Sequence, residues 1–295
     1  MFKKVRSIFR SKKNKTKDNA IVNIERYVKN GRIPWSEGYH DYKFKMLYEN
    51  IRDVDLLKSF RNKKLPNGYG KGLDERIVEI PWVIDNVSNN KTKFLDAGSS
   101  FNFDHIVSLQ KLEDKDLTIF TFDPETNNFA SKRISYVYED LRELPFKDSY
   151  FDEIASISTI EHVDMDNSIY GWNQNNAHIH NQNKSYEYLK VIHELNRVLK
   201  PNGSLLITFP FGKFENHGFF QQFDDEMLLK ITDILGGSGE YELDFFKYTP
   251  KGWEFCNQND CKDIVSYNPH TGKGKLDDGA AHCRSVCCIK FKKNK

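Results

Sequence analysis

Short apolar runs alternate with amphipathic helical segments through the middle of the chain. The first run opens the stretch Lys93–His105, where apolar residues lead into an acid and then into small residues. A buried parallel strand has this pattern, and small residues after it let a ligand approach the backbone closely. Four later runs are similar: Leu117–Phe122, Ile134–Tyr138, Ile154–Ile157 and Ser204–Phe209. Strands that alternate with helices predict right-handed crossovers and a parallel sheet.

Two helices and two more strands complete the expected pattern. The segment Tyr186–Leu199 repeats apolar residues at helical spacing and stops at the turn Pro201–Gly203. Asp224–Leu235 predicts a second helix. Two final strands are expected at Tyr241–Tyr248 and Arg284–Phe291.

The N-terminal third has a helical pattern rich in aromatic residues. It runs from Asn19 to about Phe60, and a further helix is expected over Arg76–Val87, interrupted at Pro81. The glycine-rich stretch Asn67–Gly72 lacks the ending of a phosphate-binding loop and predicts a mobile connection. We therefore expect a basic flexible N-terminus (1–18), a helical cap (19–88) and one α/β domain (89–295).

Composition excludes several classes of protein. The chain has 295 residues, 38% of them hydrophobic, and its net charge of +2 gives no reason to expect a nucleic-acid partner. The 5 cysteines lack the C-x-x-C pairs of a zinc site, their number is odd, and no apolar signal segment follows the first basic residues. No run approaches the ~18 apolar residues of a spanning helix. These features predict a cytoplasmic protein.

Residues 1–17 are dense in Lys and Arg, with Phe2, Val5, Ile8 and Phe9 spaced as one face of a helix. A basic amphipathic segment can rest on an anionic membrane surface, here the inner face of the membrane. The alternative is a solvated terminus that binds nothing.

Candidate chemistry gathers where the predicted strands end. In an open α/β sheet, ligands bind beyond the carboxyl ends of the strands, next to a helix N-terminus. Asp123 ends the second run, where a carboxylate is placed to accept hydrogen bonds from both hydroxyls of a ribose. The alternative for such an acid is to cap the next helix.

The order of these segments resembles class I S-adenosylmethionine-dependent methyltransferases. The resemblance covers about Lys93 to Phe211 and includes DAGSS, EDLRELPFKDSYFDEIASISTIEHV and ELNRVLKPNGSLLITFP. It implies a Rossmann-like seven-stranded sheet with helices on both faces, with the last two strands forming an antiparallel edge. The family's first motif usually reads D-x-G-x-G-x-G, whereas this chain has Ser100 and Asn102 at the positions of the later glycines.

The resemblance also implies roles for individual residues around S-adenosylmethionine. The first loop would line the methionine part, the acid of the second strand would hold the ribose, the segment after the third strand would contact the adenine, and the end of the fourth strand would border the site of methyl delivery. In that order, the residues are Asp96, Gly98, Ser99 and Ser100; Asp123; Asp140 and Leu141; Ser158 and Thr159.

A hydroxyl acceptor needs a base to take its proton. His162, just past the fourth strand, is the best-placed candidate, and Glu161 could orient it. The alternative is that both residues pack structurally against the cofactor loop.

A polar insertion, Asp164–Lys184, separates the fourth strand from the long helix. Its Asn and Gln residues, with Tyr170 and Trp172, suit a carbohydrate-like acceptor. A divalent metal on His178 and His180, with Asp164 or Asp166, is a weaker hypothesis because nothing in the sequence shows that these ligands converge, and no metal site is predicted.

The sequence therefore predicts an S-adenosylmethionine-dependent methyltransferase that acts on a small-molecule acceptor. O-methylation of a hydroxylated compound, such as a sugar in surface polysaccharide biosynthesis, is the main hypothesis. The alternatives are C- or N-methylation of a lipid-like or amine acceptor, supported by the basic N-terminus, and a non-catalytic binding module that keeps the fold, permitted by the missing glycines.

Overall fold

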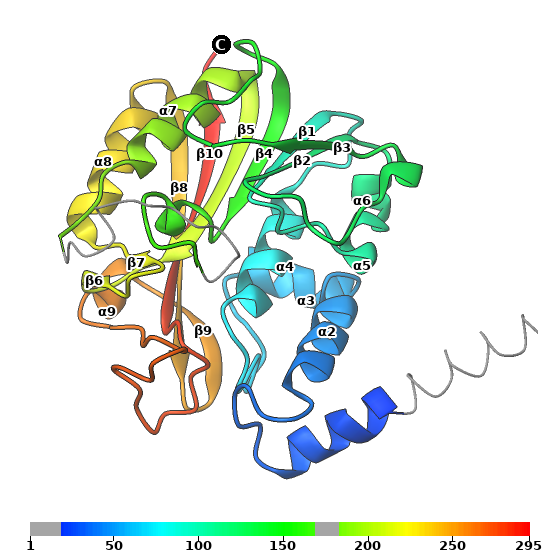
Figure 1. Ribbon diagram of the computed structural model, residues 1–295, viewed down its shortest axis with the longest axis vertical. Coiled ribbons are helices and arrows are strands. Elements are labelled where there is room, and N and C mark those ends of the chain that lie inside the picture. The colour runs from blue at the N-terminus through cyan, green and yellow to red at the C-terminus, as the bar shows by residue number, and fades with distance from the viewer. Residues whose placement is uncertain (1–18, 169–182) are drawn as a thin grey trace, which may run out of the picture.

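The computed structural model describes residues 19–168 and 183–295, which form an eight-stranded sheet with helices against it (Figure 1). The strands, in spatial order, are β3 (Ser135–Tyr138), β2 (Asp116–Thr121), β1 (Lys93–Ala97), β4 (Phe151–Ile157), β5 (Leu199–Pro210), β10 (Ser285–Lys293), β8 (Gly239–Thr249) and β9 (Gly252–Cys256). The first five are parallel to one another, as the alternation of strands and helices predicts.

The last strands depart from the expected edge. Strand β10 pairs antiparallel with both β5 and β8, so it lies inside the sheet. The edge is β9, which the apolar pattern did not reveal and which forms a tight hairpin with β8 through Tyr248 and Trp253. The Rossmann-like fold is confirmed, with eight strands in place of the expected seven.

Each face of the sheet has its own apolar core, because alternate side chains of a strand point to opposite faces. On β5, Leu206 joins the core beneath the N-terminal helices, whereas Leu205 and Ile207 join the core beneath the later helices. Strand β10 divides in the same way, with Cys288 on the first side and Cys287 on the second. Helices therefore cover both faces.

On one side of the sheet lie several helices from the first part of the chain, and a helix over 19–29 precedes them, farther from the sheet at the bottom of the view (Figure 1). These are α2 (Tyr39–Asn50), α3 (Val54–Arg61), α4 (Arg76–Asn86), α5 (Asp104–Val107) and α6 (Gln110–Glu113). The other face carries α7 (Tyr188–Val198) and α8 (Asp225–Gly236), and α9 (Gln258–Cys261) follows β9. The division into a cap and a main domain remains a prediction.

Helix α4 continues through Pro81, contrary to the predicted interruption. Proline has no amide hydrogen, so the carbonyl four residues earlier, that of Ile77, loses its helical partner. The hydroxyl of Tyr69 donates to this carbonyl at 2.6 Å. The helix tolerates proline because a side chain from the glycine-rich stretch supplies the missing donor.

Strand β5 begins earlier than expected. Leu199 pairs with Phe151, and the next paired residue on β5 is Ser204, opposite Glu153. The intervening residues include Asn202, whose φ is 59°. The predicted turn is therefore a bulge within one strand. A short hairpin, β6 (Glu215–Asn216) and β7 (Gln221–Gln222), was also not foreseen.

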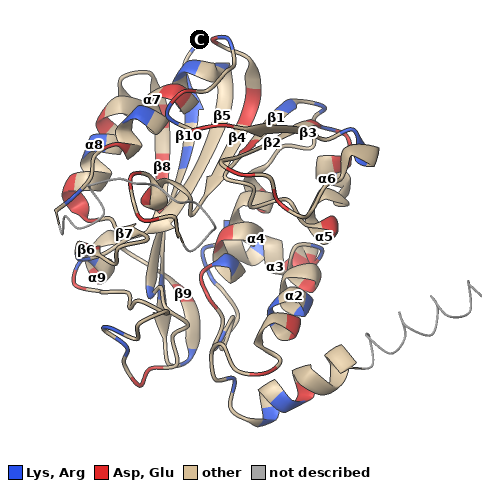
Figure 2. Ribbon diagram, viewed as in Figure 1, with Lys and Arg blue, Asp and Glu red and all other residues tan. Residues whose placement is uncertain are grey.

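Charges of both signs are interspersed along the ribbon, for example on α2 and α7 (Figure 2). Among the described residues, no helix combines the length and the apolar character needed to cross a membrane. The basic segment 1–17, on which the membrane hypothesis rests, lies outside the described residues.

A buried ion pair lies at the amino-terminal ends of the central strands, opposite their carboxyl ends. The Nζ of Lys115 lies 2.5 Å from Oε2 of Glu153 and also donates to the hydroxyl of Thr92 at 2.9 Å. Both charged side chains are buried. Removal of one partner of such a pair leaves an uncompensated charge in a desolvated site.

We expect Lys115→Met to lower the free energy of unfolding by about 3 kcal/mol, because the Glu153 charge is left without its cation. Urea denaturation measures this change. Lys91→Met, at an exposed position nearby, is the matched control and should change stability by less than about 0.5 kcal/mol. Equal effects in the two variants would contradict a stabilising role for the pair.

Candidate active site

A cleft of about 420 Å³ opens at the carboxyl ends of the parallel strands. Its walls come from the loops after β1, β2, β3 and β4 and from the start of α4. The lining residues are Arg76, Gly98, Ser100, Thr121, Phe122, Asp123, Pro124, Glu125, Glu139, Asp140, Leu141, Arg142, Ser158, Thr159, His162, Val163, Asp164 and Asn167. The sheet thus brings together most of the residues singled out in the sequence. Asp96, Ser99 and Glu161 do not line the cleft.

Asp96 lies beneath the loop after β1 and holds its shape. The carboxylate accepts hydrogen bonds from the backbone N–H groups of Ser100, at 3.2 Å, and Phe101, at 2.8 Å. Burial raises the pKa of Asp96 to about 7, although both hydrogen bonds oppose that rise. The side chain therefore organises the loop from below.

Gly98 lies where the loop after β1 packs closely against the loop after β4. Its φ is 123°, and a Cβ added there would lie 2.0 Å from Oγ1 of Thr159 and 2.8 Å from Cβ of Thr159. The next residue, Ser99, also has a positive φ, 61°. Glycine is thus required at position 98 both by backbone conformation and by the loop after β4.

The serine and asparagine that replace the family's later glycines have partners of their own. The hydroxyl of Ser100 donates to the carbonyl of Ile157 at 3.0 Å. Asn102, which is buried, donates to Glu125 at 2.8 Å, and Ser99 donates to the same carboxylate oxygen at 2.9 Å. These bonds join the loop after β1 to β4 and to the loop after β2.

Glu125 was missed by the sequence reasoning, although it follows Asp123 by only two residues. Asp123 itself is partly exposed in the cleft at the end of β2, and its carboxylate accepts no hydrogen bond from the described residues. The two acids therefore differ. Glu125 holds the neighbouring loop, whereas Asp123 is available to a ligand.

Asp140 is held by a neighbouring arginine. Arg142 donates to it through Nη2 at 2.6 Å and through Nε at 3.0 Å, and also reaches Glu187 at 3.2 Å. These contacts lower the pKa of Asp140 even though burial acts in the opposite direction. The carboxylate is ionised and fixed beside Leu141, which is buried.

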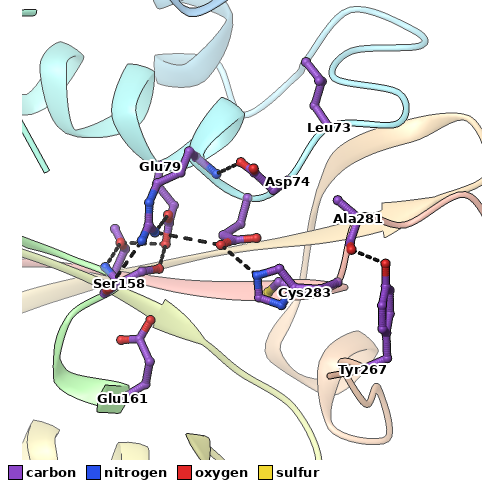
Figure 3. Close-up of polar contacts among 12 residues, drawn as sticks. Leu73, Asp74, Glu79, Ser158, Glu161, Tyr267, Ala281 and Cys283 are labelled. Atoms are coloured by element: carbon purple, nitrogen blue, oxygen red, sulfur yellow. Dashed lines mark hydrogen bonds and ion pairs between the residues drawn. The ribbon is translucent and has the colours of Figure 1, made fainter. Parts of the chain in front are cut away.

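The end of β4 is tied to helix α4. Ser158 has a φ of 38°, and its hydroxyl donates to Oε1 of Glu79 at 2.6 Å. Thr208 on β5 donates to the same oxygen at 2.7 Å. Arg76 donates to the other oxygen of Glu79 at 2.5 Å and to the carbonyl of Ser158 at 3.3 Å (Figure 3). Neither Arg76 nor Glu79 was identified from sequence.

His162 lies on a short 3₁₀ turn, η2 (Ile160–His162), with Nδ1 2.7 Å from the carbonyl of Phe219. A carbonyl only accepts, so Nδ1 carries the hydrogen of the neutral ring and the lone pair is on Nε2. Burial lowers the pKa of His162 to about 4. The imidazole is therefore neutral and basic at Nε2 under physiological conditions.

Glu161, expected to orient His162, lies beside the other ring nitrogen. Its Oε1 lies 3.9 Å from Nε2, on the opposite side of the ring from Phe219. Glu161 is buried, and burial raises its pKa well above the ordinary value. The carbonyl of Phe219 fixes the tautomer instead.

The described residues contain no group of three or more His, Cys, Asp or Glu side chains that could hold a metal ion. His178 and His180, on which the metal hypothesis depends, lie outside the described residues, as do Tyr170 and Trp172. The polar lining of the cleft combines carboxylates, hydroxyls, two guanidinium groups, an amide and one imidazole.

The close packing around Gly98 leads to a prediction about the stability of the fold. We expect Gly98→Ala to lower the free energy of unfolding by more than about 2 kcal/mol, since an L-residue at positive φ alone costs about 1–2 kcal/mol. Gly31→Ala is the control because its φ is 86° but no atom lies within 4 Å of the added Cβ. Adding Thr159→Ala to Gly98→Ala should restore only part of the lost stability, because Cβ of residue 159 remains. Urea or thermal unfolding of Gly98→Ala, Gly31→Ala, Thr159→Ala and the double variant measures these differences.

Residues 108–207 match a protein family described as a methyltransferase domain. No protein with a curated description matches the chain significantly. Solved structures with a similar fold include the 1,6-didemethyltoxoflavin-N1-methyltransferase of Burkholderia thailandensis with bound 1,6-didemethyltoxoflavin and S-adenosylhomocysteine. It is 11% identical, with a TM-score of 0.42 over 70% of this chain and 72% of that chain.

Two further structures are similar over nearly their whole length. The YcgJ protein of Bacillus subtilis is 12% identical, with a TM-score of 0.47 over 74% of this chain and 98% of that chain. A SAM-dependent methyltransferase of Methanosarcina mazei is 16% identical, with a TM-score of 0.42 over 72% of this chain and 98% of that chain. The family match spans the region in which β2, β3, β4 and most of β5 build the cleft. Residues 108–207 thus match a methyltransferase domain, and the sheet around them has the Rossmann-like architecture that the resemblance to class I S-adenosylmethionine-dependent methyltransferases predicted.

Proposed function

We propose that this methyltransferase acts on a hydroxyl group of a small acceptor and that His162 is its general base. The observation that carries the proposal is the imidazole in the cleft, with Nδ1 held by the carbonyl of Phe219 and a lowered pKa. Such a ring is neutral at physiological pH and can accept a proton at Nε2.

The residues of the cleft fit S-adenosylmethionine. Asp123 offers a carboxylate that no described residue engages, as recognition of two ribose hydroxyls requires. Gly98 leaves the backbone open where a side chain could not fit. We assign Gly98 and Ser100 to the methionine part, with Asp96 and Ser99 supporting that loop from behind.

The remaining assignments follow the order of the strands. Asp140 and Leu141 would face the adenine, and Ser158 and Thr159 would border the acceptor end of the cleft. When bound, the cofactor supplies a methyl group activated by a positively charged sulfur. The protein's own contribution is to hold the acceptor oxygen in line and to exclude water, because positioning dominates such transfers.

His162 would take the proton of the acceptor hydroxyl as the oxygen attacks. The bond to Phe219 keeps the ring oriented and leaves Nε2 as the receiving atom. Sugars are the acceptors that we propose to screen first, as in surface polysaccharide assembly, because the segment 164–184 is rich in Asn and Gln. If the screen instead found methyl transfer to an amine, the proposed class of hydroxylated acceptors would be replaced by amines.

We expect Asp123→Ala to weaken binding of S-adenosylmethionine and S-adenosylhomocysteine by about 10- to 100-fold, the value of a hydrogen bond to a charged group. Isothermal titration measures both ligands. Asp116→Ala is the control, since Asp116 is an exposed aspartate at the other end of the same strand. If the folded wild-type protein bound neither ligand, the cofactor assignment would fail.

We expect His162→Ala to lower kcat by about 100-fold or more while cofactor affinity is unchanged. Protonation removes the base, so the wild-type rate should fall as pH drops through about 4 and stay level near neutrality. The exposed His193→Ala is the control. A rate that falls already as the pH drops through about 6.5, the pKa of an ordinary histidine, would argue against His162 as the base.

A further inference from the structure

Unpartnered polar atoms concentrate beside the acceptor end of the cleft. Among the described residues, ten buried side-chain nitrogen or oxygen atoms have no hydrogen-bond partner, and five belong to one group of residues. These are Oε2 of Glu75, Oε2 of Glu161, both ring nitrogens of His217 and Nδ1 of His282. We call Glu75, Glu161, His217 and His282 the inner cluster.

The inner cluster is contiguous although its members come from separate segments. The ring of Phe220 stacks on His217 at 4.4 Å and also lies 5.6 Å from His282. His282 reaches Glu75 at 3.3 Å, and Phe220 lies 6.2 Å from His162, the neighbour of Glu161. The start of α4, the turn η2, the β6–β7 hairpin and the segment before β10 thus meet at one place.

The cluster adjoins the cleft through residues that line it. Arg76 follows Glu75, and His162 follows Glu161, and both line the cleft. Figure 3 shows the side chain of Glu161 pointing toward Ser158 and Glu79, with no dashed line to any residue drawn. Oε2 of this deeply buried carboxyl therefore lies in the region between η2 and α4 without a hydrogen-bond partner.

Buried polar atoms without partners destabilise a fold, so native proteins contain few of them. Five in one place indicate that the fold keeps them for a ligand or for the water that a ligand displaces. Both donors and acceptors are offered, since an imidazole nitrogen can donate or accept and a carboxyl oxygen can accept.

The charges in this region select against ionised ligands. His282 compensates Glu75, since the proximity of the two raises the pKa of His282 and lowers that of Glu75. Arg76 compensates Glu79. Burial raises the pKa of Glu161 well above its ordinary value, and burial lowers the pKa of His217 to about 4. The region is thus rich in hydrogen-bonding groups, but its two cationic side chains, Arg76 and His282, are already paired with carboxylates and leave no cation for an anionic ligand.

We propose that the inner cluster binds the hydroxyl groups of the methyl acceptor, and that the acceptor is a small neutral polyhydroxylated molecule. This inference rests on the proposed function and deepens it. Glu161 and His217 supply the unpartnered donors and acceptors, and the Glu75–His282 pair closes the far side. Three carboxyl groups around one arginine and one histidine exclude carboxylated or phosphorylated acceptors.

The first test is His217→Phe, which keeps the ring stacked on Phe220 but removes both unpartnered nitrogens. We expect the thermal midpoint to rise by about 2 °C or more, because two desolvated atoms are lost. Affinity for S-adenosylmethionine should stay within about twofold, whereas KM for the acceptor should rise by about tenfold with little change in kcat. A fall in the midpoint would show that the nitrogens are satisfied structurally and would overturn the proposal.

His105→Phe is the matched control. His105 also has an unpartnered buried nitrogen and packs against aromatic rings, but it lies on α5, outside the inner cluster. Its replacement should leave the acceptor KM unchanged.

Two variants test Glu161. Glu161→Gln retains a polar group that can hydrogen-bond and should keep most methyl transfer, whereas Glu161→Leu should raise the acceptor KM as His217→Phe does. Equal activity of Glu161→Leu and wild type would overturn the assignment.

The acceptor class is tested with named probes and radiolabelled cofactor. Myo-inositol and methyl α-glucoside are the neutral probes, glucuronate and glucose 6-phosphate the anionic ones, and ethanolamine the amine. Transfer to a neutral probe alone supports the proposal. Preference for an anionic probe or for ethanolamine, or cofactor binding with no transfer to either neutral probe, would overturn it. Absence of cofactor binding would instead contradict the proposed function, so the two failures can be told apart.

Discussion

The ion pair between Arg76 and Glu79 is the contact on which the active site depends. It lies at the start of α4, where Glu79 also accepts hydrogen bonds from Ser158 at the end of β4 and from Thr208 on β5. One carboxylate thus joins a helix to the two strands that bound the acceptor end of the cleft. Because Glu79 is fully buried, loss of Arg76 would leave its charge uncompensated.

The loop after β1 reaches a similar rigidity by a different route from the glycine-rich form usual in the family. Ser100 and Asn102 occupy positions where glycine is common, and each has a defined hydrogen-bond partner, Ile157 and Glu125 respectively. Gly98 alone keeps its glycine, because Thr159 leaves no room for a Cβ. Side-chain hydrogen bonds therefore replace backbone freedom as the means of shaping the loop.

Around Glu161 and His217, the stability of the fold and the proposed binding of a hydroxylated acceptor make opposite demands on the side chains. The core clusters on both faces of the sheet are well-filled and apolar, whereas the region around Glu161 and His217 retains polar atoms without protein partners. An apolar set of residues there would stabilise the fold but could not recognise a hydroxylated ligand. Burial affects His162 as well, since it lowers the pKa of the imidazole and so keeps the ring neutral near pH 7.

The sequence by itself determined the five parallel strands and the position of Asp123, because apolar runs and the residues that end them are local features of the chain. Only the tertiary structure decided the rest. The imidazole of His162 is oriented by Phe219, 57 residues away in sequence, and Ser158 is held by Glu79, 79 residues away. Pro81 stays within α4 because Tyr69 supplies a donor, and β9 adds an edge that no apolar run announced. Such contacts depend on which surfaces meet when the chain folds, and single-residue patterns carry no record of them.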